Sequence, residues 1–170
     1  MNGHSFTRIP AATALGLSLL VGSAFGQQRS LAEQLLGTWT LVSHESVRAD
    51  GTRTPVYGVN PKGIAFFDAG GHFIITVMRA DRTKYAIDFP TQGTAEENKT
   101  TAQGTMTYFG TYSVSEADHT IALHIEASSF PNWNEADQKR TFAIAGDQLT
   151  LTARALQTGG YADVVWKRAK

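Results

Sequence analysis

The chain contains no cysteine, and that absence excludes several classes of site. A disulfide framework, a cysteine nucleophile and a cysteine metal site all need a thiol. Long helical patterns are few, and no block of like charge occurs, since 15 basic residues balance 15 acidic ones. A nucleic-acid-binding surface is therefore not expected, because such surfaces need clustered positive charge.

Metal and nucleophile motifs are also missing from the sequence. The histidines His44, His72, His119 and His124 are scattered, without the spacing of a metal site, so no metal is expected. The pattern Gly-x-Ser-x-Gly, which marks a serine hydrolase, does not occur. A serine triad therefore has no local signature in this sequence.

The N-terminus has the pattern of a secretory signal peptide. Residues 1–10 include Arg8 but no acid, residues 11–25 are uncharged, and Ala24 and Gly26 are small residues at the two positions a signal peptidase reads. We expect cleavage after Gly26, a mature domain of residues 27–170, and a periplasmic or secreted location. The alternative is an uncleaved anchor, which needs about 20 apolar residues. The run is short and rich in glycine and alanine, so no stable membrane span is expected after cleavage.

The mature chain predicts one all-β domain. The 170 residues, 42% of them hydrophobic, can bury a core, and 16 glycines suit short strands and turns. Alternation predicts strands at about 37–46, 64–68, 72–79, 105–115, 119–128, 138–145, 148–154 and 161–168. An antiparallel up-and-down barrel of about eight strands closes such a set and leaves room for a small ligand. A two-sheet sandwich is the alternative.

Two capping boxes predict one or two short helices. Ser30 and Glu33 have the spacing that starts a helix at about 31–36. Thr94 and Glu97 have the same spacing, and a helix from there to about 103 would end at Gly104. The second helix has little apolar stripe, so we expect a surface helix or a lid over an opening.

Residues 119–142 are the most promising place for a site. They read as two strands joined by a loop with Phe130, Pro131 and Trp133, so large rings gather there. On the first strand an apolar face alternates with a face carrying His124 and Glu126. The polar face turns outward in a one-sided sheet and inward in a barrel with a ligand cavity. The sequence leaves both orientations open.

Motifs along the mature chain resemble those of a known family. Leu36-Gly37-Thr38-Trp39 is similar to the Gly-x-Trp entry of the lipocalins. More specific similarity to the bacterial and fungal lipocalin-like domain family lies in segments 60–63, 77–82, 93–97, 108–112, 124–128, 130–133 and 146–151. The resemblance spans about residues 35–168 and implies a calycin-type, lipocalin-like barrel with a pocket for a small molecule. The sequence departs from the family in its leader and at Asn134, where a glycine is expected.

Candidate ligand-binding residues follow from these patterns. The polar orienting groups are His124, Asn132 and Arg140, and the walls are Met78, Tyr108, Tyr112 and Trp133. A loop centred on residue 133 would place Glu126 opposite Arg140 as an ion pair. Trp39 is expected to close the base of the barrel beneath Lys167 or Arg168.

Three functions are compatible with these residues. The first is carriage of a small, mostly apolar or amphipathic molecule, with no cofactor. The second is a cyclase, isomerase or hydrolase in which His124 or Glu126 does acid–base work. The third is an envelope or structural protein whose barrel is filled by its own side chains. A shifted titration beside an open cavity would favour the enzyme, and side chains packed across the interior would favour the third.

Overall fold

The structure, a computed structural model, describes residues 1, 3, 29–155 and 159–170. Apart from residues 1 and 3, the predicted signal peptide lies outside the described residues. Where the chain is described, no helix is long and apolar enough to cross a membrane.

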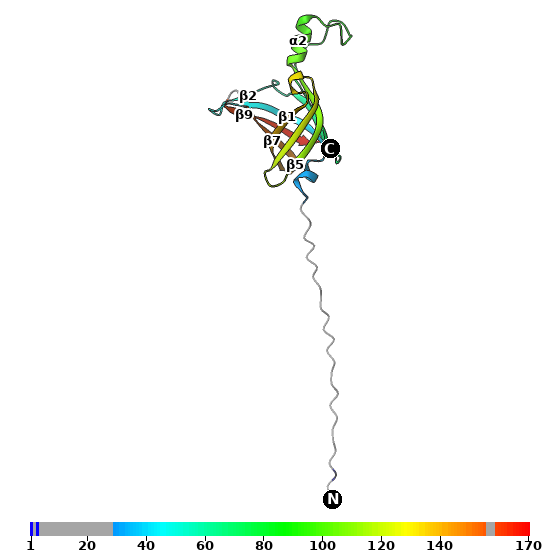
Figure 1. Cartoon of the computed structure of the whole chain (residues 1–170), viewed down its shortest axis with the longest axis vertical. Coiled ribbons are helices and arrows are strands. Elements are labelled where there is room, and N and C mark those ends of the chain that lie inside the picture. Colours follow the sequence, from blue (N-terminus) through cyan, green and yellow to red (C-terminus); the bar gives the residue numbers. More distant parts are fainter. Residues whose placement is uncertain (2, 4–28, 156–158) are drawn as a thin grey trace.

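Nine strands form one continuous antiparallel sheet (Figure 1). The strands are β1 (Gly37–Val47), β2 (Arg53–Pro55), β3 (Lys62–Phe67), β4 (His72–Met78), β5 (Thr105–Ser115), β6 (Thr120–Ser128), β7 (Ala136–Ala145), β8 (Gln148–Ala155) and β9 (Gly160–Arg168). Strand β1 pairs with β3 along its first part and with β9 along most of its length, while β2 pairs only with the end of β1. Eight strands therefore close into a barrel in chain order, which confirms the predicted fold.

A β-bulge changes which side chains of β1 face the interior. Leu41 pairs with Trp166 and His44 pairs with Val164, with the register shifting between residues 41 and 43. Because Trp166 and Val164 lie on the same face of β9, Leu41 and His44 both point inward. Simple alternation along the strand would put His44 on the face opposite Leu41, but one extra residue in a strand exchanges its faces.

Strand β6 turns its apolar face into the barrel. Ile121, Leu123 and Ile125 are fully or almost fully buried, whereas His124 and Glu126 are exposed. The core continues around the interior with large buried side chains from other strands, among them Phe67, Ile75, Leu149, Leu151 and Trp166. The polar face of residues 119–128 therefore lies outside.

Gly110 allows a close approach of two backbones. The register of β5 against β6 shifts between Phe109 and Gly110. A Cβ atom on Gly110 would collide with the carbonyl oxygen of His124. Glycine is therefore the residue that fits this bend.

One end of the barrel is closed by helix α1 (Leu31–Leu35), whose predicted capping box is present. Trp39 is fully buried beneath it, and its indole N–H donates to the carbonyl of Leu35 at 2.8 Å. The guanidinium carbon of Arg168 lies 4.1 Å from the centre of the Trp39 ring. This confirms the predicted structural role of Trp39 beneath the last strand.

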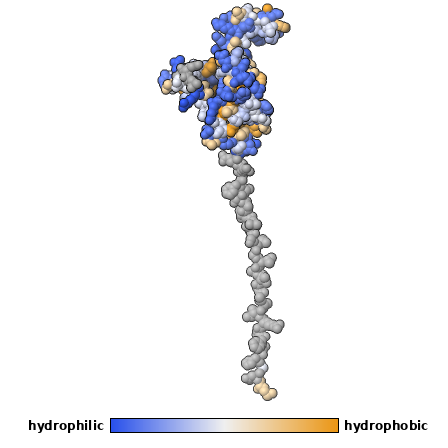
Figure 2. Space-filling view, in the orientation of Figure 1, coloured by the Kyte–Doolittle hydropathy of each residue, from blue (hydrophilic) through white to orange (hydrophobic). Residues whose placement is uncertain are grey.

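Helix α2 (Ala95–Gln103) stands away from the barrel at the opposite end (Figure 1). Its capping box between Thr94 and Glu97 is present, and Glu97 also accepts from the backbone of Ala86 at 2.8 Å. None of its residues is buried, and its surface is largely hydrophilic (Figure 2). Of the two predicted alternatives, a surface helix or a lid over an opening, α2 is therefore a surface helix.

Candidate ligand-binding site

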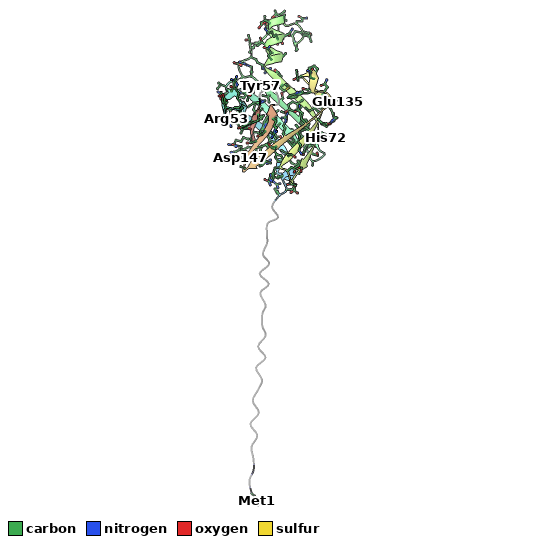
Figure 3. The ribbon with its side chains drawn as sticks, turned by 60° about the vertical axis from the view of Figure 1, so that its left-hand side comes forward. Met1, Arg53, Tyr57, His72, Glu135 and Asp147 are labelled. Atoms are coloured by element: carbon green, nitrogen blue, oxygen red, sulfur yellow. The ribbon has the colours of Figure 1, made fainter. Side chains whose placement is uncertain are left out.

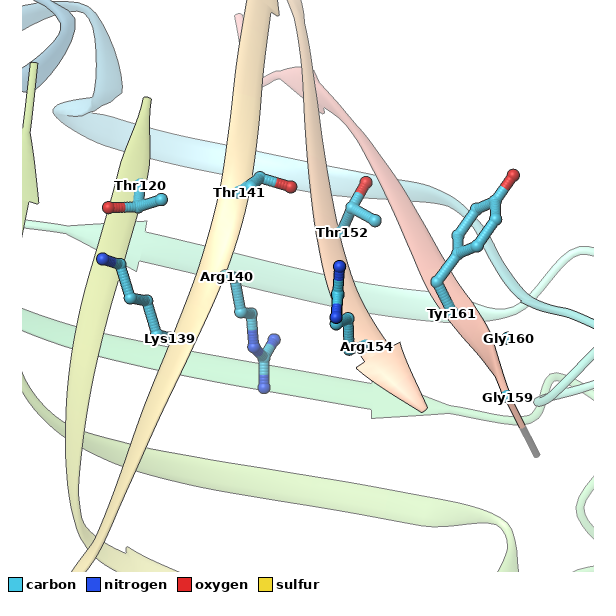
Figure 4. Close-up of a pocket in the computed structure, with 9 residues that line it drawn as sticks. All are labelled: Thr120, Lys139, Arg140, Thr141, Thr152, Arg154, Gly159, Gly160 and Tyr161. Atoms are coloured by element: carbon cyan, nitrogen blue, oxygen red, sulfur yellow. The ribbon is translucent and has the colours of Figure 1, made fainter. Parts of the chain in front are cut away.

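The wall of the barrel opens between β7 and β8. The two strands pair only from Thr141 with Thr152 to Ala145 with Gln148. Residues 136–140 of β7 pair with β6 alone, and residues 153–155 of β8 pair with β9 alone. Figure 4 shows the two strands diverging beyond the paired segment. A gap therefore separates the first half of β7 from the second half of β8.

A pocket of about 810 Å³ occupies this gap. Its lining contains three cationic side chains and no carboxylate. The lining residues are Thr120, Lys139, Arg140, Thr141, Thr152, Arg154, Gly159, Gly160 and Tyr161 (Figure 4). The volume is within the range of small-molecule sites, about 300–1,000 Å³.

Arg140 connects this pocket to the interior of the barrel. Only 7% of the residue is exposed, although its neighbours on β7, Lys139 and Thr141, are exposed. One terminal nitrogen, Nη1, donates to the hydroxyl of Tyr108 at 2.8 Å, and Nη2 donates to Oε1 of Gln138 at 2.7 Å. Both partners are neutral. Among the described residues the buried Nε–H has no hydrogen-bond partner.

His44 and Tyr57 complete an interior polar cluster, which we define as His44, Tyr57, Tyr108, Gln138 and Arg140. The rings of His44 and Tyr57 have centroids 5.2 Å apart. Burial, reinforced by the positive charge of Arg140, lowers the pKa of His44 from 6.5 to about 4. Burial also raises the pKa of Tyr57, with a smaller effect of Tyr108. At neutral pH, Arg140 is therefore the only charged member of the cluster.

His44 also has unused hydrogen-bonding capacity. Its Nδ1 is buried and has no partner among the described residues. A neutral imidazole has one donor and one acceptor nitrogen, so His44 can contact either kind of polar group. The Nε–H of Arg140 and the Nδ1 of His44 are thus two interior positions where a ligand could form polar contacts.

Three of the seven predicted ligand-binding residues meet at this place. Arg140 contacts Tyr108, with its guanidinium carbon 5.4 Å from the centre of the phenol ring. Trp133, in the 3-10 turn η1 (Pro131–Trp133), packs edge-on against Tyr108 at 5.4 Å between ring centroids. Tyr112 belongs to the same core but points elsewhere, since its hydroxyl donates to the carbonyl of Asp68 at 2.7 Å.

The other three predicted residues lie away from the cluster. His124 is on the outer face, where its Nδ1 is 2.9 Å from a carboxylate oxygen of Asp137. That hydrogen bond is the main cause that raises the pKa of His124. Asn132 is exposed, and Met78 shares the outer face of β4 with its sulfur 3.0 Å from a nitrogen of Arg82. None of these three contacts the interior polar cluster.

The predicted Glu126–Arg140 pair is not formed. Arg140 pairs with Ile121 in the β6–β7 ladder, and Glu126 lies on the opposite, outer face. The loop is centred between residues 130 and 131, because Ile125 pairs with Ala136. Asn134, the position that departs from the family pattern, stabilises this loop by accepting from the backbone N–H of Ser128 at 2.8 Å.

Several residues of the pocket and cluster were missed by sequence reasoning. His44 was hidden by the bulge, and Tyr57 comes from the segment after β2, which alternation does not place (Figure 3). Lys139 and Arg154 alternate outward and look like ordinary surface residues until the β7–β8 gap brings them to one opening. The sequence signal that could have indicated the pocket is that two neighbouring strands, β7 and β8, each carry an outward-facing cationic side chain.

No group of three or more metal-ligating side chains occurs among the residues searched, which are the described ones. The cluster offers one neutral histidine and no carboxylate. A hard or borderline metal ion would be repelled by Arg140 there.

The profile of the lipocalin-like domain family matches residues 36–169. Similar solved structures include a lipocalin-like protein from Bacteroides uniformis, 17% identical with a TM-score of 0.46, covering 79% of this chain and 98% of that one. A redesigned β barrel is 13% identical with a TM-score of 0.42, over 82% and 95% of the two chains. The wild-type fluorescent protein UnaG is 10% identical with a TM-score of 0.39, over 82% and 100%. No curated protein sequence matches the chain.

A closed eight-stranded antiparallel barrel with a side pocket is consistent with small-molecule binding. The profile match spans most of the sequence, and the chain belongs to the lipocalin-like domain family.

Proposed function

We propose that this protein binds a small, mostly apolar molecule through the β7–β8 gap, with Arg140 as the principal polar contact. The supporting observation is the environment of Arg140. Only 7% of Arg140 is exposed and its guanidinium has only neutral partners, so the charge carries an uncompensated desolvation cost of several kcal/mol. A ligand that supplies hydrogen-bond acceptors at Nε recovers part of that cost. The pocket in the β7–β8 gap is the space for the remainder of the molecule, beside the apolar core that contains Tyr108.

Native mass spectrometry of residues 27–170, purified from the natural host, tests this proposal. We expect a reproducible bound mass in the wild type that is lost in Arg140→Leu. The matched control is Arg79→Leu, because Arg79 is a surface arginine paired with Asp81 and lies outside the pocket. A bound mass that persists in Arg140→Leu contradicts a role for this residue. A wild type that is empty and takes up no apolar compound contradicts binding altogether.

A ligand-free structural barrel is the second candidate, and aromatic packing favours it. Phe67 lies edge-on to Tyr112 at 5.3 Å, and Phe73 lies edge-on to Tyr108 at 5.8 Å. All four rings belong to the core cluster or pack against it. An empty protein in the experiment above would support this function.

The acid–base chemistry anticipated for His124 and Glu126 is not part of the proposal. Both side chains are exposed on the outer face of β6 and neither lines the pocket. A water-excluded site is what gives such groups their catalytic effect. His124 lacks that environment.

We also propose export, with residues 1–26 as a cleaved signal peptide. The support is the sequence pattern of a short uncharged run followed by small residues. N-terminal sequencing of the protein from a periplasmic or culture-medium fraction should find Gln27 first. A protein that begins at residue 1 or 2 and stays in the cytosol contradicts export.

A further inference from the structure

We propose that the ligand is an apolar monoanion, with a carboxylate head group held at Arg140 in the β7–β8 gap and an apolar tail. This rests on the proposed function and adds the chemical class of the ligand. Three independent features of the described residues support it. They are the unpaired segments of β7 and β8, the positive charge of the pocket lining, and the N–H groups of Arg140 that have no partner.

The gap between β7 and β8 gives a charged head group access to Arg140 through the side of the barrel. Arg140 is the last residue of β7 before pairing with β8 begins at Thr141. Its guanidinium lies between the two diverging strands (Figure 4). A head group in the gap can therefore reach a side chain that the closed part of the barrel would have covered.

The local charge has one sign although the chain as a whole is balanced. Lys139 and Arg154 flank Arg140, and no acid lines the pocket. Lys139 has only a distant surface partner, Asp118 at 3.8 Å, and Arg154 forms no ion pair within the described residues. Such an opening attracts anions and disfavours cationic ligands.

Arg140 has donors left for a carboxylate. An arginine carries five N–H donors, of which Tyr108 and Gln138 use one each. The remaining three include Nε–H, which is buried and has no partner among the described residues. A planar carboxylate can accept from two N–H groups of one guanidinium at once. The head group would also supply the negative charge that the cluster lacks.

We assign an apolar tail to the ligand because the residues around the interior polar cluster are apolar. Tyr108 contacts Phe73 and Trp133, and the neighbouring inward positions on β6 are Ile121 and Leu123. A second charge on the ligand would have no partner there. A ligand with one anionic end therefore fits better than a neutral molecule or a compact polyanion.

Calorimetric titration with three probes of equal length tests the inference: dodecanoate, dodecan-1-ol and dodecylammonium, each below its aggregation concentration. We expect the wild-type mature protein to bind dodecanoate at least about tenfold more tightly than dodecan-1-ol, because a hydrogen-bonded charge pair is stronger than a neutral contact. Dodecylammonium should bind most weakly. Arg140→Leu should abolish the preference for dodecanoate, and Arg79→Leu should retain it.

A second variant does not depend on changing a buried residue. Lys139→Gln combined with Arg154→Gln alters two exposed side chains, so the fold should be kept. We expect about a fivefold loss of dodecanoate affinity, a weaker dependence of that affinity on salt, and a smaller loss for dodecan-1-ol, which carries no charge for the two cations to attract. An equal loss for both probes would indicate a structural effect and contradict the inference.

His44 supplies an independent readout. The groups facing it are Tyr57 and the charge of Arg140. A carboxylate at Arg140 offsets that positive charge, so dodecanoate should raise the pKa of His44 in NMR titration, whereas dodecan-1-ol should not. The signal is assigned by its absence in His44→Gln.

The outcomes separate the two proposals. Equal affinity for dodecanoate and dodecan-1-ol leaves the proposed function standing and overturns the carboxylate inference. Preference for dodecan-1-ol or dodecylammonium overturns it as well. Binding of none of the three, together with an empty protein in native mass spectrometry, overturns both.

Discussion

His44 should make the stability of the folded protein fall as pH is lowered through the weakly acidic range. In the barrel its pKa is lowered to about 4 by burial and by Arg140, whereas an exposed histidine in the unfolded chain has a pKa of about 6.5. Above pH 6.5 the imidazole is neutral in both states and no penalty arises. Below pH 6.5 the unfolded state gains a proton first, so stability is lost until the folded state also protonates near pH 4.

The size of the effect follows from the two pKa values. Between pH 7.5 and pH 5 the difference in proton binding corresponds to about 2 kcal/mol, and the full loss below pH 4 to about 3 kcal/mol. A typical domain is stable by about 5–15 kcal/mol. One partly buried histidine should therefore remove a measurable share of the stability.

Urea unfolding of residues 27–170 at pH 7.5, 6 and 5 measures this in the wild type and in His44→Gln. Glutamine does not titrate, so the stability of the wild type should decline by about 2 kcal/mol more than that of the variant between the first and last pH. Near-ultraviolet circular dichroism at pH 7.5 checks that the variant is folded. Parallel pH profiles for the two proteins would refute the reasoning, because they would mean that His44 is not desolvated beside Arg140.

Three other substitutions test separate parts of the fold. His124→Gln should change the pH dependence of stability in the opposite direction from His44→Gln. The raised pKa of His124 stabilises the folded state below about pH 6.5, and this stabilisation disappears as pH rises through the folded pKa. The free energies of unfolding of wild type and variant, measured with urea, should therefore converge above neutrality. Trp39→Ala should lower the free energy of unfolding by about 3–5 kcal/mol, because a fully buried indole leaves a cavity, while Val42→Ala on the exposed face should change it by less than about 0.5 kcal/mol. Gly110→Ala should cost about 1–3 kcal/mol in the same assay, since its methyl group meets backbone, and a neutral result would mean that the β5–β6 bulge relaxes freely.

The elements that the sequence predicted well are those set by local chemistry. Helix α1 starts where Ser30 and Glu33 form their capping box, and α2 ends at Gly104, because caps depend on residues three or four apart. Strand alternation likewise placed Ile121 and Leu123 on one face. These signals need no knowledge of distant partners.

The candidate site was predicted only in part because it depends on register. His44 is inside because a bulge shifts β1 by one residue, and Arg140 faces Ile121 because the β6–β7 loop is centred near residue 130 and not near residue 133. A change of one residue in register exchanges the faces of a strand. Tyr108, Trp133 and Arg140 could be named as candidates because large rings and a basic residue near one loop are conspicuous in the sequence itself.

The desolvation cost of Arg140 can explain why the hydrogen-bond ladder between β7 and β8 stops at Thr141. Extending the ladder past Thr141 would add a few backbone hydrogen bonds, each contributing about 0.5–1.5 kcal/mol net. The same closure would seal a guanidinium with neutral partners inside an apolar barrel, at a cost of several kcal/mol. An open wall leaves the small exposed part of this mostly buried side chain within reach of water or of a ligand's head group. The free energy gained from the extra hydrogen bonds and the free energy lost by sealing the guanidinium are of similar size and opposite sign. A barrel that contains Arg140 should therefore favour diverging strands at this position, and these strands form the opening to the ligand site.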